Sequence, residues 1–183
     1  MLPVLRSYKN HFPIIGHSVY LDPFSSLIGD VTLDDDVSIW PMCVLRGDVN
    51  SIKVGKRTNI QDGSVLHVAR KGEASVDGYS LMIGEDVTVG HKAMLHACQI
   101  GSRVLIGMGA IILDNAKIND DVIIAAGALV APNKILESGF LYVGSPAKQA
   151  RPLTEQEFAF LKRSAQHYVD LKNDYLAETN KTS

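Results

Sequence analysis

Residues 67–96 read HVARKGEASVDGYSLMIGEDVTVGHKAMLH, and this stretch holds three histidines within a run of six-residue repeats. An aliphatic residue opens each repeat, often followed by glycine, with a small or β-branched residue four positions later. Three such pairs are Val54 and Thr58, Ile60 and Ser64, and Ile83 and Val87. Hexapeptide self-similarity of this kind predicts a β-helix, in which each repeat contributes one short strand and one turn.

The spacing of the repeat openings gives each histidine a position on the coil. The central openings are Leu45, Val54, Ile60, Leu66, Ile83, Val89 and Leu95, so the steps are sixes interrupted by insertions of 3 and 11 residues. His67 and His96 are 29 residues apart, and without the 11-residue insertion they are 18 apart, which is three repeats or one turn of a three-sided coil. They should therefore stack on adjacent rungs, about 4.8 Å apart. The same count places Arg46 in their column.

A second column contains Asp62 and His91, each two residues past an opening, with Gln61 beneath Gly90 in the same way. This column lies one face earlier on the coil, so His91 should not reach the pair formed by His67 and His96 within one chain. A neighbouring coil could supply it. In a cyclic trimer each interface joins two different faces of adjacent subunits. A ring of three subunits therefore brings the first column of one chain against the second column of the next at three equivalent interfaces.

Three histidines in two columns one rung apart predict a metal site. Three neutral imidazoles on a four-coordinate ion leave one position for water, which is the pattern of a catalytic zinc. Such a water ionises near pH 7 and becomes a nucleophile. Taken singly, a histidine in a β-turn is more often a solvated surface residue, and the metal interpretation depends on the shared spacing.

The chain resembles the gamma-class carbonic anhydrases, and most closely their short bacterial branch of YrdA-type proteins. The resemblance covers roughly residues 10–150. It is carried by Arg46-Gly47-Asp48, Asn59-Ile60-Gln61-Asp62-Gly63, His67, Gly90-His91 and His96.

This resemblance implies an all-β fold, a left-handed parallel β-helix, and a homotrimer that hydrates carbon dioxide reversibly to bicarbonate. It implies a Zn2+ cofactor, or alternatively Fe2+, bound by His67 and His96 of one chain and His91 of the next. The residues implied to act around the metal are Arg46 and Asp62, paired across the interface, Asp48 in the same polar network, and Gln61 with Asn59, which orient the hydroxide and the substrate. The Arg46–Asp62 pair could equally be an ordinary trimer salt bridge, and we expect it to be both.

Two positions depart from the family pattern. The archetypal enzyme has a glutamate just after the Arg-x-Asp motif and another in an acidic loop after the first histidine ligand, where it passes protons to solvent. This chain has Val49 at the first place and Arg70, within VARKGE, near the second. A positioned proton-transfer group contributes about a hundredfold or more. We therefore expect a complete metal site with low hydration activity.

Composition indicates a single soluble domain over residues 1–183, with 46% hydrophobic and 21% charged residues. The formal net charge of −2 gives no general attraction to nucleic acid or to anionic membranes. The two cysteines, Cys43 and Cys98, form no disulfide framework and are expected to be buried, inert thiols. Without a signal or transmembrane segment, the expected compartment is the cytoplasm.

The expected organisation has three parts: an N-terminal lead-in over 1–27, the β-helix over 28–150 and a C-terminal helix over 154–178. Repeats are expected to begin at Ile28, with a first step of five, and to continue as a ladder of scaffold coils after Leu95. Residues 68–82 form the main insertion. Thr154 and Glu157 have the spacing of a capping box at the start of an amphipathic helix.

Two other functions remain open. Residues 143–148 (VGSPAK) resemble the segment that closes the coil in hexapeptide acyltransferases, which suggests an acyl-coenzyme A transferase or a thioesterase-like hydrolase. A single catalytic histidine of that kind would leave the other histidines unexplained. The second alternative is a non-catalytic assembly subunit in which the ion only ties a trimer together.

Overall fold

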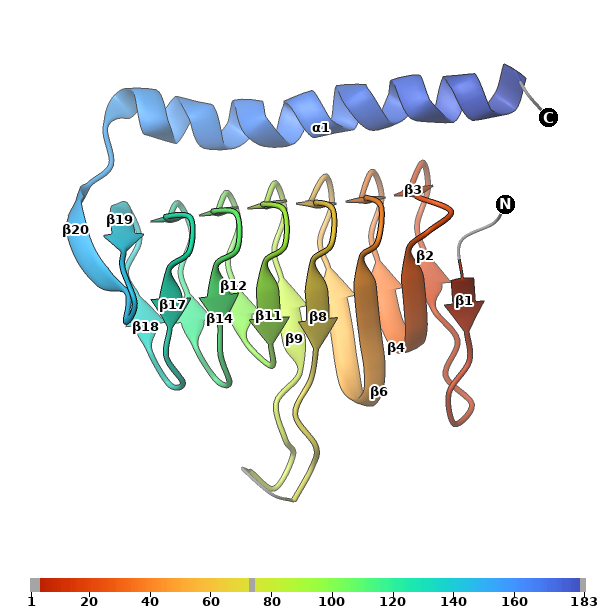
Figure 1. The fold of residues 1–183 in the computed structure, drawn as a ribbon, viewed down its shortest axis with the longest axis horizontal. Helices are drawn as coiled ribbons and strands as arrows, with labels where there is room; N and C mark the ends of the chain where they lie inside the picture. The colour runs from red at the N-terminus through yellow and green to blue at the C-terminus, as the bar shows by residue number, and fades with distance from the viewer. Residues whose placement is uncertain (1–3, 73–74, 182–183) are drawn as a thin grey trace.

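A computed structural model describes residues 4–72 and 75–181. These residues form a parallel β-solenoid whose short strands stack into three faces, and a single long helix runs beside the coil from end to end (Figure 1). The predicted all-β coil with a C-terminal helix is therefore confirmed. Within the described residues, no helix is long and apolar enough to cross a membrane.

The strands of each face pair in parallel with the equivalent strands of the coils before and after. The first face contains β8 (Val65–His67), β11 (Met94–His96), β14 (Ile111–Ile112) and β17 (Leu129–Val130). The second contains β9 (Leu81–Ile83), β12 (Gln99–Ile100), β15 (Lys117–Ile118) and β18 (Ile135–Leu136). The third contains β3 (Tyr20–Leu21), β5 (Ser38–Ile39), β7 (Asn59–Ile60), β10 (Thr88–Val89), β13 (Leu105–Ile106), β16 (Ile123–Ile124) and β19 (Phe140–Val143).

Two longer strands, β4 (Ser26–Leu33) and β6 (Val44–Val54), bend from the first face to the second. The first half of β6 pairs with β8, and its second half pairs with β9. The strands β1 (Val4–Arg6) and β2 (Ile14–Ile15) pair with β4, and β3 pairs with β5, so regular pairing starts within the segment expected to be a lead-in. Residues 1–3 of that segment lie outside the described part.

The repeat openings fill the interior of the coil, as the hexapeptide pattern predicts. The openings from Leu45 to Val130 are 0–4% exposed. At the start of the coil the inward residue is Leu27, which pairs with Leu45 and is fully buried, whereas Ile28 faces outward beside Arg46. The expected opening at Ile28 is therefore wrong. Leu27, Leu33, Ile39 and Leu45 are spaced by six, and the apparent step of five disappears.

The turn between the third and first faces repeats one backbone conformation in successive coils. Residues with positive φ occupy equivalent places there: Met42, Gly63, Lys92, Gly109 and Gly127. Glycine adopts this conformation freely, whereas it costs an L-residue such as Met42 or Lys92 about 1–2 kcal/mol, so the strands on either side must hold those two turns in place. Asp62 and His91 each come directly before such a residue, which gives them the same place in this turn on neighbouring coils.

The helix α1 (Glu155–Lys181) covers the third face, where it contacts β3, β5, β7 and β10. The capping box is confirmed, because the Glu157 N–H donates to Thr154 Oγ1 and the Thr154 N–H donates to Glu157 Oε2. The helix continues three residues beyond the predicted end at 178. Trp40 anchors it, with its ring centroid 5.6 Å from that of Tyr168 and 5.2 Å from that of Tyr175.

The insertion between β8 and β9 projects away from the coil as a long loop (Figure 1). Asn50, at the bend of β6, holds the loop at its base, because its Nδ2 donates to Asp77 O at 3.0 Å and to Ala69 O at 3.4 Å. Ala69 also pairs with Tyr79 across the loop. Residues 73 and 74, which belong to the predicted insertion, lie outside the described part.

Candidate metal centre

The first predicted column is confirmed by the strand register. Arg46 pairs with His67, and His67 pairs with His96, so these three residues are neighbours on successive coils of the first face. Side chains along each strand alternate between the inside and the outside of the coil. Each of the three residues directly follows a fully buried leucine, which is Leu45, Leu66 or Leu95, and therefore lies on the outer side. The buried leucines therefore fix the outward direction of the arginine and the two histidines.

The two imidazoles point one nitrogen at each other and the other nitrogen at a carboxylate. His67 Nδ1 lies 3.1 Å from His96 Nε2. His67 Nε2 lies 2.9 Å from Asp48 Oδ1, and His96 Nδ1 lies 2.5 Å from Asp114 Oδ1. An ionised carboxylate only accepts hydrogen bonds, so each carboxylate assigns the proton to the ring nitrogen beside it. In the neutral rings this leaves two nitrogen lone pairs that face one another.

This arrangement fits a bound cation. Two imidazole nitrogens at 2.0–2.1 Å from one tetrahedral zinc ion lie roughly 3.4 Å apart, close to the separation seen here. Histidines that bind metals almost always donate their other N–H to a carboxylate, a carbonyl or water, which fixes the tautomer and the ring direction. Both histidines satisfy this condition, and two facing lone pairs repel unless a proton or a metal ion lies between them.

Electrostatics favour the neutral form of His67 and the ionised form of Asp48. Burial, the largest effect, lowers the pKa of His67 below its usual value despite the hydrogen bond with Asp48. Partial burial opposes ionisation of Asp48, but hydrogen bonds from His67 and Arg46 outweigh it and lower the pKa of that carboxyl. A histidine binds a metal ion as the neutral imidazole, so these shifts support ligation near neutral pH.

The second column is also present. His91 Nδ1 lies 2.9 Å from Asp62 Oδ2 on the coil below, and both side chains are about half exposed at the corner between the third and first faces. Gln61, beside them, is nearly buried, and its Nε2 donates to Asn59 Oδ1 at 3.1 Å. Asn59 donates in turn to Thr88 Oγ1 on the next coil, so the position of the glutamine is set through Asn59.

The two columns stand at opposite edges of the first face. His91 precedes the strand β11, and His96 ends it. Within the described residues of one chain, no group of three His, Cys, Asp or Glu side chains converges to hold a metal ion. That one chain supplies only two of the three histidines to any one site stays a prediction.

The arginine lies in the predicted network but has a partner within its own chain. Arg46 forms an ion pair with Asp48, which continues the chain of contacts through His67 and His96 to Asp114. Asp62, the partner implied across a subunit boundary, contacts His91 instead in the single chain. The Arg46–Asp62 pair therefore stays a prediction about the assembled oligomer.

Sequence reasoning missed Asp114. This residue follows β14 and contacts His96 from the next coil, in a part of the chain that was interpreted as scaffold. Strict stacking places Leu113 above His96, because Leu95 pairs with Ile112, and it leaves Asp114 one residue out of the column. A search for one carboxylate near each histidine would have found it, 18 residues after His96.

A cavity of about 300 Å³ opens beside the two histidines. Its walls include Asp114 together with Val49 and Arg70, the two positions that depart from the family pattern.

The two cysteines lie in the core, away from this cavity. Burial raises the pKa of Cys43 to about 11 and raises the pKa of Cys98 as well, which confirms the prediction of buried thiols.

Comparisons with known proteins agree with this fold and site. The family model described as bacterial transferase hexapeptide (six repeats) matches residues 97–132. The protein YrdA of Escherichia coli is 58% identical, covering 100% of this chain and 99% of the relative. Gamma carbonic anhydrase 1, mitochondrial, of Arabidopsis thaliana is 44% identical, covering 96% of this chain and 65% of the relative. A solved structure from Bacillus cereus, described as a putative acetyltransferase, has a TM-score of 0.89 and 37% identity, covering 96% of this chain and 98% of that one.

The repeats, the three-faced parallel coil and the histidine columns define a hexapeptide-repeat β-solenoid protein with a candidate metal centre. Among such proteins, the chain belongs to the gamma carbonic anhydrase family, in its YrdA-type branch.

Proposed function

We propose that this protein is a metal-dependent carbonic anhydrase homologue that catalyses the reversible hydration of carbon dioxide at a site shared between subunits of a homotrimer. The observation that carries the proposal is the pair of imidazole nitrogens 3.1 Å apart, each ring held by a carboxylate through its other nitrogen. The likeness to a gamma carbonic anhydrase over 96% of the chain supports it.

The first face supports the trimer. Its outward side chains Met94 and Ile111 are exposed in the single chain, and Met42 and Met108 are exposed in the turn that leads into this face. Contiguous exposed apolar surface marks interaction sites. The two histidine columns flank this face at its opposite edges. A cyclic trimer that buries it would bring His91 of the partner subunit beside His67 and His96 and so complete a three-histidine ligand set.

The chemistry at such a site is divided between the ion and the chain. A zinc or ferrous ion, when bound, would lower the pKa of a coordinated water and supply hydroxide at neutral pH. Asp48 and Asp114 hold the histidine tautomers that leave a nitrogen free for the metal. Gln61, held by Asn59, presents a fixed amide next to the His91 corner, where it would orient carbon dioxide and hydroxide.

Among the described residues that line the cavity, the two positions where the family has glutamates carry no group that exports a proton. Val49 cannot exchange a proton, and Arg70 stays protonated. General acid–base catalysis typically contributes about 10²–10⁴-fold, so we infer a low turnover that external buffer assists. Rising buffer concentration should therefore increase the rate of hydration.

The test is anaerobic purification with metal analysis, followed directly by stopped-flow hydration of carbon dioxide. We expect a trimer with one metal ion per subunit that hydrates carbon dioxide faster than the same concentration of free metal. A fully loaded trimer that is no faster than free metal would remove this function and leave the fold unchanged. Anaerobic handling matters because air would oxidise a bound ferrous ion, and the loss of activity would then say nothing about the function of the native protein.

Acyl transfer is a second candidate function, because the solved Bacillus cereus structure with the same fold is described as a putative acetyltransferase. An acyl-coenzyme A assay separates the two functions. Acyl transfer that survives metal removal would favour the acyltransferase or a thioesterase-like hydrolase. Trimers that dissociate on metal removal, without activity beforehand, would favour a non-catalytic assembly subunit.

A further inference from the structure

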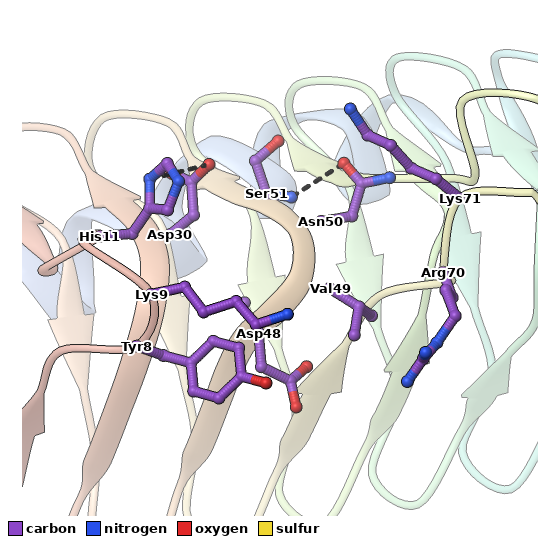
Figure 2. A pocket seen from close by; sticks show the side chains of 11 residues that line it. Tyr8, Lys9, His11, Asp30, Asp48, Val49, Asn50, Ser51, Arg70 and Lys71 are labelled. Carbon is purple, nitrogen blue, oxygen red and sulfur yellow. Dashed lines mark hydrogen bonds and ion pairs between the residues drawn. The ribbon is translucent and has the colours of Figure 1, made fainter.

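A second and larger cavity, of about 530 Å³, adjoins the candidate metal centre. Tyr8 and Lys9 form one side, the bend of β6 forms the floor, and Arg70 and Lys71 form the other side (Figure 2). The two cavities share three lining residues, Asp48, Val49 and Arg70. They are therefore adjacent cavities that meet at these three residues.

The walls of this cavity carry unbalanced positive charge. Among the described residues, Lys9, Arg70 and Lys71 form no ion pair with a carboxylate. Of the two acidic residues of the lining, Asp48 is already paired with Arg46, which lies outside this lining, and also contacts His67. Asp30 lies 3.9 Å from His11. Three cations thus face a space in which Asp30 and Asp48 are the described carboxylates, and Asp48 has a cationic partner of its own.

The cationic side of the cavity is positioned by the body of the protein. Asn50 ties Ala69 and Asp77 of the loop to the bend of β6, and the Ala69 N–H donates to Tyr79 O at 2.9 Å. Arg70 follows Ala69 directly, so its backbone is anchored beside the cavity. On the opposite side, Lys9 extends toward the β6 bend over the Tyr8 ring, with its Nζ 5.5 Å from the ring centroid.

The space is larger than bicarbonate needs. Pockets for small organic ligands typically measure about 300–1,000 Å³, whereas bicarbonate has four heavy atoms. Clustered lysine and arginine side chains bind carboxylates and phosphates, with arginine making two parallel hydrogen bonds to either group.

We propose that this cavity binds the carboxylate or phosphate end of an organic substrate whose carbonyl end lies at the metal centre. This inference deepens the proposed function, because it assigns the metal site a substrate class larger than carbon dioxide. Binding of the anionic end needs Lys9 and Arg70 and does not need the metal.

Titration calorimetry of the metal-free, full-length protein at low ionic strength tests the binding. The probes are succinate, inorganic phosphate and the neutral analogue succinamide. We expect succinate or phosphate to bind and succinamide not to bind. The double variant Lys9→Ala with Arg70→Ala should lose at least tenfold in affinity for the anion. The matched control, Lys117→Ala with Lys148→Ala, removes the same charge away from the cavity and should bind as the wild type does.

All four replaced side chains are exposed, so both double variants should unfold at the wild-type temperature. Tighter binding of succinate would assign the anionic end as a carboxylate, and tighter binding of phosphate would assign a phosphate. Equal affinity in the two double variants, or no anion binding by the wild type, would overturn the proposal. These outcomes do not depend on hydration activity, so they are distinct from a failure of the carbonic anhydrase assignment.

Proximity to the metal is tested with the protein loaded with Co2+. The protons of bound succinate, or the phosphorus nucleus of bound phosphate, should relax faster in the cobalt-loaded protein than in the zinc-loaded protein. Paramagnetic enhancement of relaxation falls steeply with distance, so it reports a ligand close to the metal. Binding without enhancement would separate the cavity from the metal centre and overturn the substrate assignment. A protein that takes up no cobalt would instead count against the proposed function.

Discussion

His67 Nδ1 and His96 Nε2 lie 3.1 Å apart, one rung of the coil from each other, and no backbone element other than their two parallel strands is needed to bring them there. Adjacent parallel strands are about 4.8 Å apart, so two imidazoles stacked in register and tilted toward each other reach the separation of two ligands on one ion. The repeat of the β-solenoid thus places side by side two of the three histidines of the proposed ligand set.

Replacement of Asp114 by asparagine should weaken metal binding by about 10–100-fold, because the carboxylate fixes the tautomer and direction of His96. The measurement is competition with a chelator of known affinity. Asp34→Asn, an exposed carboxylate elsewhere on the coil, is the control and should leave the affinity unchanged. Wild-type affinity in Asp114→Asn would show that Asp114 does not position the ligand.

Mixed oligomers should reveal that the site is shared. The variants His67→Ala and His91→Ala, each assembled alone, should contain no intact metal site. If they are unfolded together in equal amounts and reassembled at random, about a quarter of the sites regain an intact His67 on one side and an intact His91 on the other. Metal content and hydration should recover to that fraction.

A matched mixture distinguishes this recovery from a general effect of refolding. His67 and His96 belong to the same side of the proposed site, so a mixture of His67→Ala with His96→Ala should recover nothing. Equal recovery in both mixtures, or none in either, would contradict a site made by His67 and His96 of one subunit with His91 of its neighbour.

Trp40→Ala should destabilise the protein by roughly 3–5 kcal/mol, the usual range for removing a large buried aromatic side chain. Trp40 is 5% exposed and contacts Tyr20, Tyr168 and Tyr175 between the third face and α1. Urea denaturation measures the change. Phe24→Ala, at a side chain 63% exposed, should change stability by about 0.5 kcal/mol or less. Similar effects of both substitutions would mean that α1 is not anchored at Trp40.

Acid should remove the contribution of the capping box. Hydrogen bonds from Arg151 and from the Thr154 backbone lower the pKa of Glu157 to about 2. Because the pKa is lower in the folded state, this stabilisation is present above the ordinary carboxyl pKa, about 4.3, and is lost as pH falls toward 2. The unfolding temperatures of wild type and Glu157→Gln should therefore differ at pH 6 and converge near pH 2.

Repeat arithmetic predicted the histidine columns because the coil has a fixed number of residues per turn, and each in-register step carries every side chain to the same place. It failed at Ile28, where a following glycine imitated the repeat signature although Leu27 is the residue inside the coil. It also missed Asp114, whose contact with His96 depends on side-chain reach between places that are not in register. Local spacing could not indicate which face α1 covers, because that choice depends on aromatic residues as distant as Tyr20 and Tyr175.

The coil ends at β20 (Lys148–Pro152), which turns back and pairs antiparallel with β19. The reversed strand replaces the next parallel rung on the third face, and its proline and charged side chains suit an edge that must not recruit another chain. Growth of a fibre by end-to-end stacking of solenoids is thereby blocked at this terminus. Self-association of the proposed kind would then run sideways, through the first face.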